Sequence, residues 1–276
     1  MRKLLRANVS RLLRDRAFWL LAALMAALGA SMAVVNAVHA RQDGEIWTMD
    51  YTLFIYVILA PILASVFTSL FVGNEHSSGA MRNKLIAGHR RGCIYLADLL
   101  VSCCAGICLC LAFALPQAGL GLLLKGEWKA APAELALYIG LSFALMLAFT
   151  ALFTLIAMLC QNKAHTTAGC ILLTFALLFA GVYISSMLEE PEYLAAYSYT
   201  ENGVTVEEPE QKNPYYISGM KRQVYECLLD LTPGGQVIQI SEMGAKKPAM
   251  LAVYDGLILL LVTGFGLVLF RREDLK

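Results

Sequence analysis

The sequence predicts an all-α membrane protein with six transmembrane helices. An amphipathic helix precedes the first of them, and an external helical segment lies between the fifth and the sixth. Three observations support this fold class. Of the 276 residues, 58% are hydrophobic and 16% are charged, whereas a soluble domain is roughly half apolar and a quarter charged. The mean hydropathy is +0.62. Several apolar runs also reach the roughly 20 residues that a helix needs to cross a bilayer.

Residues 1–17 predict an interfacial helix. One helical face is apolar and the other largely basic, with Leu4, Leu5, Val9, Leu12 and Leu13 on the first and Arg2, Lys3, Arg6, Arg11 and Arg14 on the second. Such a helix lies along a membrane surface, held by apolar burial and by anionic lipid. The alternative is a plain basic flank of the first span, but the regular spacing favours the helix.

The apolar runs place spans at about 18–38, 51–72, 94–115, 133–159, 167–188 and 251–270. The first run is longer than the roughly 7–15 apolar residues of a signal peptide, so we interpret it as a span. Pro61 predicts a kink inside the second span. Pro116 predicts the end of the third. We treat residues 18–276 as one six-span domain.

Basic residues predict the orientation of the chain. Arginine and lysine are concentrated before the first span, whereas only Arg41 lies in the short loop after it. The loop 73–95 is also basic. Since basic residues in short loops mark the cytoplasmic side, both termini are predicted to be cytoplasmic. The long polar segment 189–250 is then external.

The external segment carries its own helical pattern. Val224, Cys227, Leu228 and Leu231 repeat at i, i+3, i+4 and i+7, which predicts an amphipathic helix over residues 219–231. A Thr-Pro-Gly-Gly break follows at 232–235, and then the apolar pattern resumes. We expect an interfacial or re-entrant helix pair on the outer mouth of the spans. Residues 201–213 are acidic and rich in turn formers, which suggests a mobile hairpin tip.

The loop 73–95 is the longest polar segment in the first half of the chain. It carries Glu75 together with four basic residues, Arg82, Lys84, Arg90 and Arg91. A short helix is expected from Glu75 to Leu85, with Gly79 near its start and Gly88 just past its end. A basic, structured loop offers a docking surface. The alternative is an ordinary solvated loop of the positive-inside kind.

Motifs for catalysis are absent from the sequence. No Gly-x-x-x-x-Gly-Lys-Ser/Thr phosphate loop and no His-Glu-x-x-His zinc motif occur. Cys104 and Cys108 have the spacing of a soft-metal site, but the small residues around them favour helix packing. Asp98 and Asp255, the carboxylates within spans, lie near opposite membrane faces and cannot form a catalytic pair. We therefore expect neither enzyme activity nor a cofactor on this chain.

The loop 73–95 resembles the cytoplasmic loop after the second span of ABC-2 type transporter permeases. The matching positions are Glu75, Gly79, Arg82, Leu85-Ile86, Gly88 and Arg90-Arg91. Residues 213–222, residues 233–236 and the ending Leu-Phe-Arg-Arg-Glu-Asp-Leu-Lys resemble a Gram-positive gut-bacterial subgroup. Two positions depart from the pattern. Ala80 replaces a usual threonine, which would weaken a helix cap, and Asp98 replaces a basic or small residue.

The resemblance implies a coupling helix at about Glu75 to Leu85, seated against a separate ABC ATPase subunit that binds the ATP. The coupling residues would be Glu75, Gly79, Arg82, Lys84, Gly88, Arg90 and Arg91. A second permease copy, or a related permease, would complete a dimer in the bacterial cell membrane. Lipid is a further partner, and nucleic acid is not expected.

The resemblance further implies export through the dimer interface, and an apolar, aromatic route suits a peptide, an antibiotic-like compound or a lipid-like amphiphile better than a small ion. The candidate pathway residues lie on the second and fifth spans: Phe54, Tyr56, Phe67, Phe71, Phe175 and Phe179. The alternative function is a membrane scaffold or a secondary carrier without an ATPase. A carrier predicts inverted repeats and an ionisable site at mid-membrane, and neither is found in the sequence. An intramembrane enzyme would need converging polar groups, which are not evident either.

Overall fold

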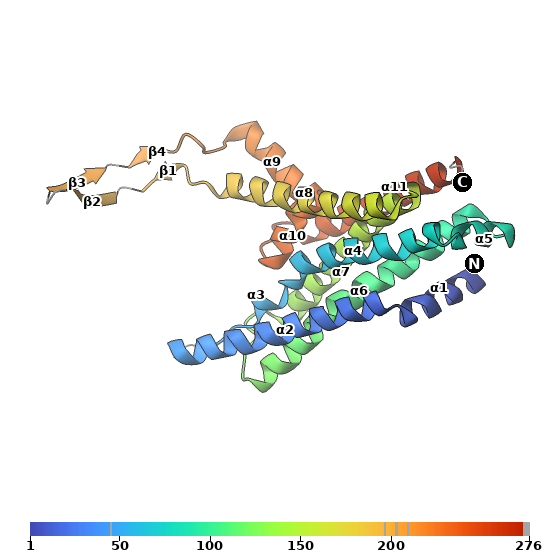
Figure 1. Ribbon diagram of the computed structural model, residues 1–276. Coiled ribbons are helices and arrows are strands. Elements are labelled where there is room, and N and C mark those ends of the chain that lie inside the picture. Colours follow the sequence, from blue (N-terminus) through green and yellow to red (C-terminus); the bar gives the residue numbers. More distant parts are fainter. Residues whose placement is uncertain (45, 196, 202–203, 209, 273–276) are drawn as a thin grey trace.

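The computed structural model describes residues 1–44, 46–195, 197–201, 204–208 and 210–272. Within these residues, six helices are long and apolar enough to cross a membrane, and they lie side by side in an elongated bundle (Figure 1). They are α2 (Arg16–Asp43), α4 (Tyr56–Ser77), α6 (Arg91–Leu123), α7 (Pro132–Leu159), α8 (Lys163–Glu189) and α11 (Pro248–Arg272). The predicted all-α membrane class is confirmed.

The shorter elements gather at the two ends of the bundle. One end, which we call the terminal end, carries α1 (Arg2–Arg14), α5 (Ala80–Ile86) and the last turn of α11 (Figure 1). Beyond the opposite end, which we call the hairpin end, project β1 (Tyr193–Leu194), β2 (Tyr197–Glu201), β3 (Val204–Glu208) and β4 (Gln211–Lys212). β2 pairs antiparallel with β3, and β1 pairs antiparallel with β4. The remaining short helices are α3 (Asp50–Leu53), α9 (Gly219–Leu231) and α10 (Pro233–Ser241).

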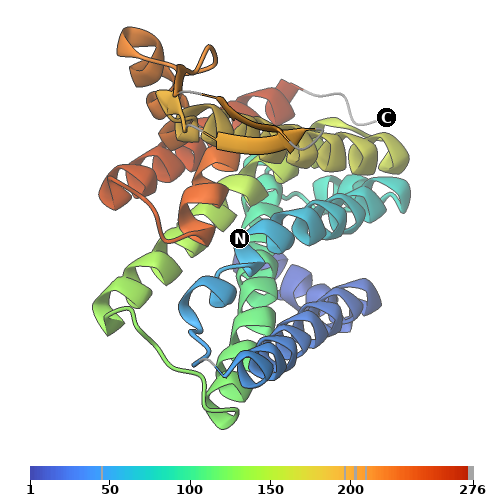
Figure 2. The same cartoon turned by 90° about the vertical axis from the view of Figure 1, so that its left-hand side faces the viewer.

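α4 is the central helix of the bundle. It contacts α6, α7 and α8, while α2 packs along α6 and α11 packs along α7 (Figure 2). In its most apolar window 67% of the residues of α4 are buried, against 22% in α2 and α8 and 17% in α11. α2, α8 and α11 therefore present broad apolar surfaces to lipid or to another protein.

Two predicted span boundaries are wrong. Pro116 lies inside α6, which continues to Leu123. A proline is tolerated in a long membrane helix when neighbouring groups satisfy the freed backbone atoms, and the next residue, Gln117, is anchored by a hydrogen bond from its Nε2 to Thr52 Oγ1 at 2.8 Å. The second span does not run unbroken from residue 51 either, because Phe54 and Ile55 separate α3 from α4.

The helix predicted over residues 219–231 is confirmed as α9. α9 has no buried residue among those described, whereas α10 inserts against α8, α7 and α4, with Val237 and Ile240 fully buried. The two helices therefore lie at different depths. The sequence predicted a helix pair on the outer mouth of the spans and did not distinguish their depths. A Cβ atom at Gly234 would lie 1.7 Å from the carbonyl oxygen of Leu177, so α10 approaches α8 at backbone distance. The tip of the predicted hairpin, residues 202 and 203, lies outside the described residues.

Candidate functional site

α5 is a short helix whose two ends are set by glycines. Gly79 precedes it with φ 70°, and Gly88 follows it with φ 83°, a conformation that glycine adopts without strain. The amides of Gly88 and His89 donate to the carbonyl oxygens of Leu85 and Lys84, at 2.9 and 3.2 Å. This is the hydrogen-bond pattern of a Schellman motif. The sequence therefore fixes α5 as a separate helical unit between two long helices.

The coupling helix was expected over residues 75–85, and its predicted start is wrong. Glu75 belongs to the last turn of α4, and α5 begins at Ala80, after the turn at Gly79. The expected consequence of Ala80 also changes, because the capping position is Gly79 and Ala80 is the first helical residue. A left-handed glycine at this turn separates two helices that periodicity alone had joined.

α5 has one inward and one outward face. Met81 is buried and Leu85 packs against the same core. Arg82 and Asn83 are exposed, and the side chain of Ile86 is 77% exposed. Because Arg82 and Ile86 are four residues apart, they share one surface of the helix. A cation beside an exposed isoleucine forms a small amphipathic surface that nothing in the described chain covers.

Glu75 lies at the centre of a buried charge network. Its side chain is fully buried, and Lys84 Nζ donates to both of its carboxylate oxygens at 2.6 Å. Arg11, from α1, donates to the same carboxylate. A buried carboxylate is costly unless cations and hydrogen-bond donors neutralise it. Glu75 is therefore a tie between α4, α5 and α1.

Asp98 extends the network to α6. It is fully buried, its Oδ1 lies 3.6 Å from Lys84 Nζ, and it accepts a hydrogen bond from Asn8 Nδ2. Asn8 Oδ1 in turn accepts a hydrogen bond from Lys84 Nζ at 3.2 Å. We call Asn8, Arg11, Glu75, Lys84 and Asp98 the buried charge network. Two carboxylates and two cations balance, as burial at low dielectric requires.

α1 is held by this network and not only by a membrane surface. Its buried residues are Leu4, Asn8 and Leu12, a stripe at i, i+4 and i+8 that faces α6. Val9 and Leu13, predicted on the same apolar face, are exposed. They remain available for lipid. The helix ends at Arg14 and not at residue 17, because Asp15 caps α2 by accepting hydrogen bonds from the amides of Ala17 and Phe18.

Arg11 also contacts the second span directly. Its guanidinium carbon lies 3.6 Å from the centroid of the Phe71 ring, and Nη2 donates to the Phe71 carbonyl oxygen at 3.2 Å. A cation over an aromatic face adds to the ion pair. α1 is thereby attached to the terminal end of α4 by one side chain in three ways.

The remaining basic residues of the predicted site have different roles. Arg82 and Arg90 are exposed. Arg91 is half-buried and donates through Nη1 to the carbonyl oxygen of Phe270 at 3.2 Å, which joins the start of α6 to the end of α11. The seven predicted coupling residues therefore fall into three groups. Gly79 and Gly88 set the ends of α5. Some tie helices together, and others face outward.

The six predicted pathway residues are not brought together in the single chain. Phe54, Tyr56, Phe67 and Phe71 are buried inside the bundle, where the Tyr56 hydroxyl is 2.7 Å from Ser142 Oγ. Phe175 and Phe179 are exposed on α8, with ring centroids 6.1 Å apart. Four of the residues thus fill the protomer core and two face outward. Their role in a pathway stays a prediction.

Asn8, Arg11 and Ile86 were not foreseen as site residues. The burial of Asn8 could have been predicted from the sequence, because Asn8 lies four residues from both Leu4 and Leu12 and therefore on the same face of the helix. The exposure of Ile86 could have been predicted too, since a helix that buries Met81 and Leu85 must turn Ile86 outward. The role of Arg11 could not, because its partner Glu75 is 64 positions away.

A protein-family model matches the larger part of the chain. The family model described as ABC-2 family transporter protein matches residues 4–182, which is more than half of the chain. The matched stretch begins in α1, includes the whole buried charge network and ends within α8. α9, α10 and α11 lie outside it. A search of curated proteins found no match.

Proposed function

The chain belongs to the ABC-2 family of transporter proteins, and on that premise we propose that it is the permease subunit of an ATP-driven exporter whose ATPase is a separate subunit. Membership of this family and the six apolar helices make it a multi-pass membrane protein of transport. The observation that carries the proposal is that α5 has one exposed face and one face linked to the rest of the bundle. No other described part of the chain covers its outer face, and its inner face is linked to three other helices.

The proposed coupling runs from the outer to the inner face of α5. An ATPase subunit contacts Arg82 and Ile86, the exposed cation and the exposed apolar side chain. Lys84, on the inner side, is bound to Glu75 of α4 and lies beside Asp98 of α6. A rigid-body displacement of α5 would therefore move the ends of both long helices together. Because the sequence has no phosphate loop, ATP binds to the partner and not to this chain.

The proposed orientation places the terminal end in the cytoplasm. That end carries the exposed bases Arg82 and Arg90 and the basic residues of α1. Basic short segments are retained on the cytoplasmic side. α5 then lies where an ATPase subunit can reach it, and α9 and the hairpin lie outside the bacterial cell membrane.

The proposed pathway lies between two permease bundles. In the described residues, the cavity beside Tyr56 and Ser142 inside the bundle measures about 10 Å³, which is too small for any substrate. The outer surface of α8, with Phe175 and Phe179, is apolar and aromatic. It suits a peptide, an antibiotic-like compound or a lipid-like amphiphile. The second bundle would be another copy of this chain or a related permease.

A secondary carrier that works without an ATPase is the second candidate, favoured by one residue. Asp255 of α11 is buried, and neither of its carboxylate oxygens has a hydrogen-bond partner among the described residues. An ionisable group inside a membrane domain is a functional candidate. If Asp255→Asn abolishes transport while the loss of ATP does not, the carrier is the better account.

Purification from the native host tests the main proposal. An ATPase subunit should co-purify with the wild-type chain in detergent, and it should be lost from the Arg82→Glu, Ile86→Asp double variant. Arg6→Glu, an exposed arginine of α1 at the same end, is the matched control and should retain it. A wild-type chain that exports substrate while no ATPase accompanies it would refute the proposal.

A further inference from the structure

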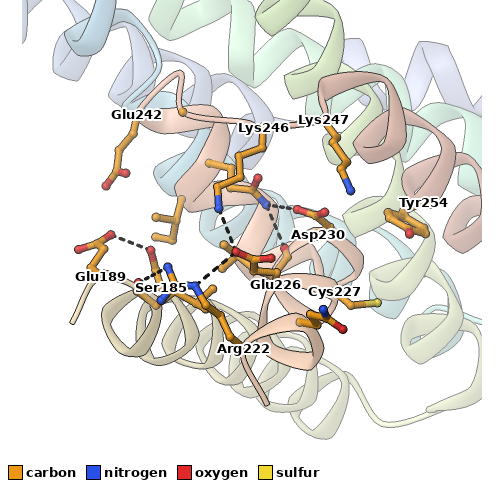
Figure 3. A pocket seen from close by; sticks show the side chains of 16 residues that line it. Ser185, Glu189, Arg222, Glu226, Cys227, Asp230, Glu242, Lys246, Lys247 and Tyr254 are labelled. Carbon is orange, nitrogen blue, oxygen red and sulfur yellow. Dashed lines mark hydrogen bonds and ion pairs between the residues drawn. The ribbon is translucent and has the colours of Figure 1, made fainter. Parts of the chain in front are cut away.

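A cavity of about 710 Å³ opens at the hairpin end of the bundle, far from α5. It is formed by the end of α8, by α9 and α10, by the loop after α10 and by the start of α11 (Figure 3). Its size is within the range of small-molecule sites, roughly 300–1,000 Å³. All of its lining residues lie outside the stretch that matches the family, and the proposed coupling makes no use of them.

The basic groups over the middle of the cavity are already paired. Lys246 Nζ lies 3.0 Å from Glu226 Oε1, and Arg222 Nε lies 3.7 Å from the same oxygen. The hydrogen bond from Lys246 lowers the pKa of Glu226. Arg222 also donates to the carbonyl oxygen of Leu188 at 3.1 Å. Both bases are thus engaged by Glu226, and neither forms an ion pair with another described carboxylate of the lining.

Three further carboxylates of the lining, those of Glu189, Asp230 and Glu242, form no ion pair among the described residues. Glu189, at the end of α8, and Glu242, just past α10, lie on the same side of the cavity (Figure 3). Among the described residues neither forms an ion pair, and Glu189 Oε1 accepts one hydrogen bond, from Ser185 Oγ at 3.0 Å. The pKa of Glu242 is raised, first by its partial removal from water and then by the negative charge of Glu189. This side of the cavity therefore attracts a cation.

Apolar side chains line the cavity beside these carboxylates. Leu188 comes from α8, Leu229 from α9 and Ile238 from α10. Three helices thus supply one apolar side chain each to a space that also holds the carboxylates of Glu189 and Glu242. Lys247 and Tyr254 lie on the opposite side from Glu189 and Glu242 (Figure 3). The charge of the lining is therefore unevenly distributed.

We propose that this cavity binds an amine-bearing amphiphile, whose ammonium group lies between Glu189 and Glu242 and whose apolar part lies against Leu188, Leu229 and Ile238. A carboxylate or phosphate at the same place would be repelled by both glutamates. The amine has two possible sources, the amino terminus of a short peptide and the headgroup of phosphatidylethanolamine. The site requires no ATPase and does not depend on the proposed coupling.

The test compares two tripeptides on the unaltered chain. The full-length protein is placed in nanodiscs of phosphatidylglycerol, which has no amine, and binding of radiolabelled Leu-Leu-Leu amide is measured by equilibrium dialysis. Binding to empty nanodiscs of the same lipid is subtracted for each tripeptide, because the anionic headgroup itself attracts an ammonium group. The N-acetylated tripeptide amide has the same apolar body without the charge. We expect the free amine to bind about threefold to tenfold more tightly, because two ion pairs at exposed glutamates each contribute modestly. Equal affinities for the two tripeptides would overturn the proposal without any variant.

Substitutions then locate the amine. Glu189→Gln and Glu242→Gln should each lower the affinity for the free amine towards that of the acetylated tripeptide. Glu210→Gln, a matched exposed carboxylate before the hairpin's last strand, should leave it unchanged. Wild-type affinity in both glutamate variants would overturn the assignment. Phosphatidylethanolamine added to the nanodiscs distinguishes the sources. It should displace the tripeptide if a lipid headgroup is the ligand, and it should leave the tripeptide bound if a free peptide is.

Discussion

Lys84 of α5 donates to both carboxylate oxygens of Glu75 of α4, at 2.6 Å each, across the turn at Gly79. Since Glu75 is fully buried and Lys84 nearly so, the pair is shielded from salt and water. α5 is consequently a rigid extension of α4 and not a solvated loop.

Removal of either partner of this pair should destabilise the bundle strongly. Lys84→Met leaves two buried carboxylates, Glu75 and Asp98, with Arg11 as their only cation in the network, at a cost of about 3–5 kcal/mol. The double variant Glu75→Gln, Lys84→Met should be less destabilised than Lys84→Met alone, because it restores the balance of one carboxylate to one cation. Unfolding in detergent, followed by circular dichroism, measures both. Arg82→Ala, on the exposed face, is the control and should change stability by less than about 0.5 kcal/mol. Strictly additive effects of the two substitutions would show that the pair is not coupled.

Asn8 should decide whether α1 stays docked. Asn8→Ala removes the hydrogen bond to Asp98 and the one from Lys84, so α1 should open more often. Hydrogen–deuterium exchange of the amides of α1 should then rise by roughly an order of magnitude, the effect of about 1.4 kcal/mol. Ser10→Ala, at an exposed position of the same helix, should leave exchange unchanged. If Asn8→Ala exchanges like wild type, the Asn8 hydrogen bonds do not hold α1 in place.

Gly234 should tolerate no side chain. A Cβ atom there would lie 1.7 Å from the carbonyl oxygen of Leu177, so Gly234→Ala must separate α10 from α8. Overpacking of this kind costs about 1–3 kcal/mol or more, and the thermal unfolding temperature should fall. Gly140→Ala is the matched control, because a Cβ atom there meets nothing within 4 Å. An unfolding temperature that Gly234→Ala leaves in place would show that the two helices pack less closely than described.

Cys227 offers a test of the proposed orientation. It is an exposed cysteine of α9, near the hairpin end. A membrane-impermeant maleimide should label it in intact cells, and Cys227→Ser should abolish that labelling. A cysteine introduced as Ile86→Cys in the Cys227→Ser background should react only after permeabilisation. The reverse pattern would place α5 outside the cell and end the coupling proposal.

The sequence predicted those parts of the fold that depend on local composition. Span positions follow from the length of apolar runs, and α9 follows from the spacing of Val224 to Leu231. The end of α6 was misplaced because Pro116 stops a soluble helix but not a membrane helix with partners around it. The turn at Gly79 was missed because residues 75–85 are compatible with one continuous helix, and only three-dimensional packing decides where it bends.

The candidate site was only half predictable for a related reason. Arg82, Gly79 and Gly88 were identified from the loop itself. The tie between Asn8 and Asp98 spans 90 positions, and nothing local in either segment specifies the other. Glu75 was assigned to an exposed docking surface because it lies in a basic loop, whereas burial makes it a structural ion-pair partner. Long-range pairing of charges becomes visible only in the folded chain.

The central claim is that the outer face of α5 meets an ATPase subunit. A photo-crosslinking amino acid at position 86 in native membranes tests it most directly, with position 193 of β1 as the control. Both side chains are exposed, but they lie at opposite ends of the bundle. We predict an adduct at position 86 with a protein that contains a phosphate loop, and no such adduct at position 193. An adduct with that ATPase at position 193, or none at position 86 in membranes that still export, would contradict the account.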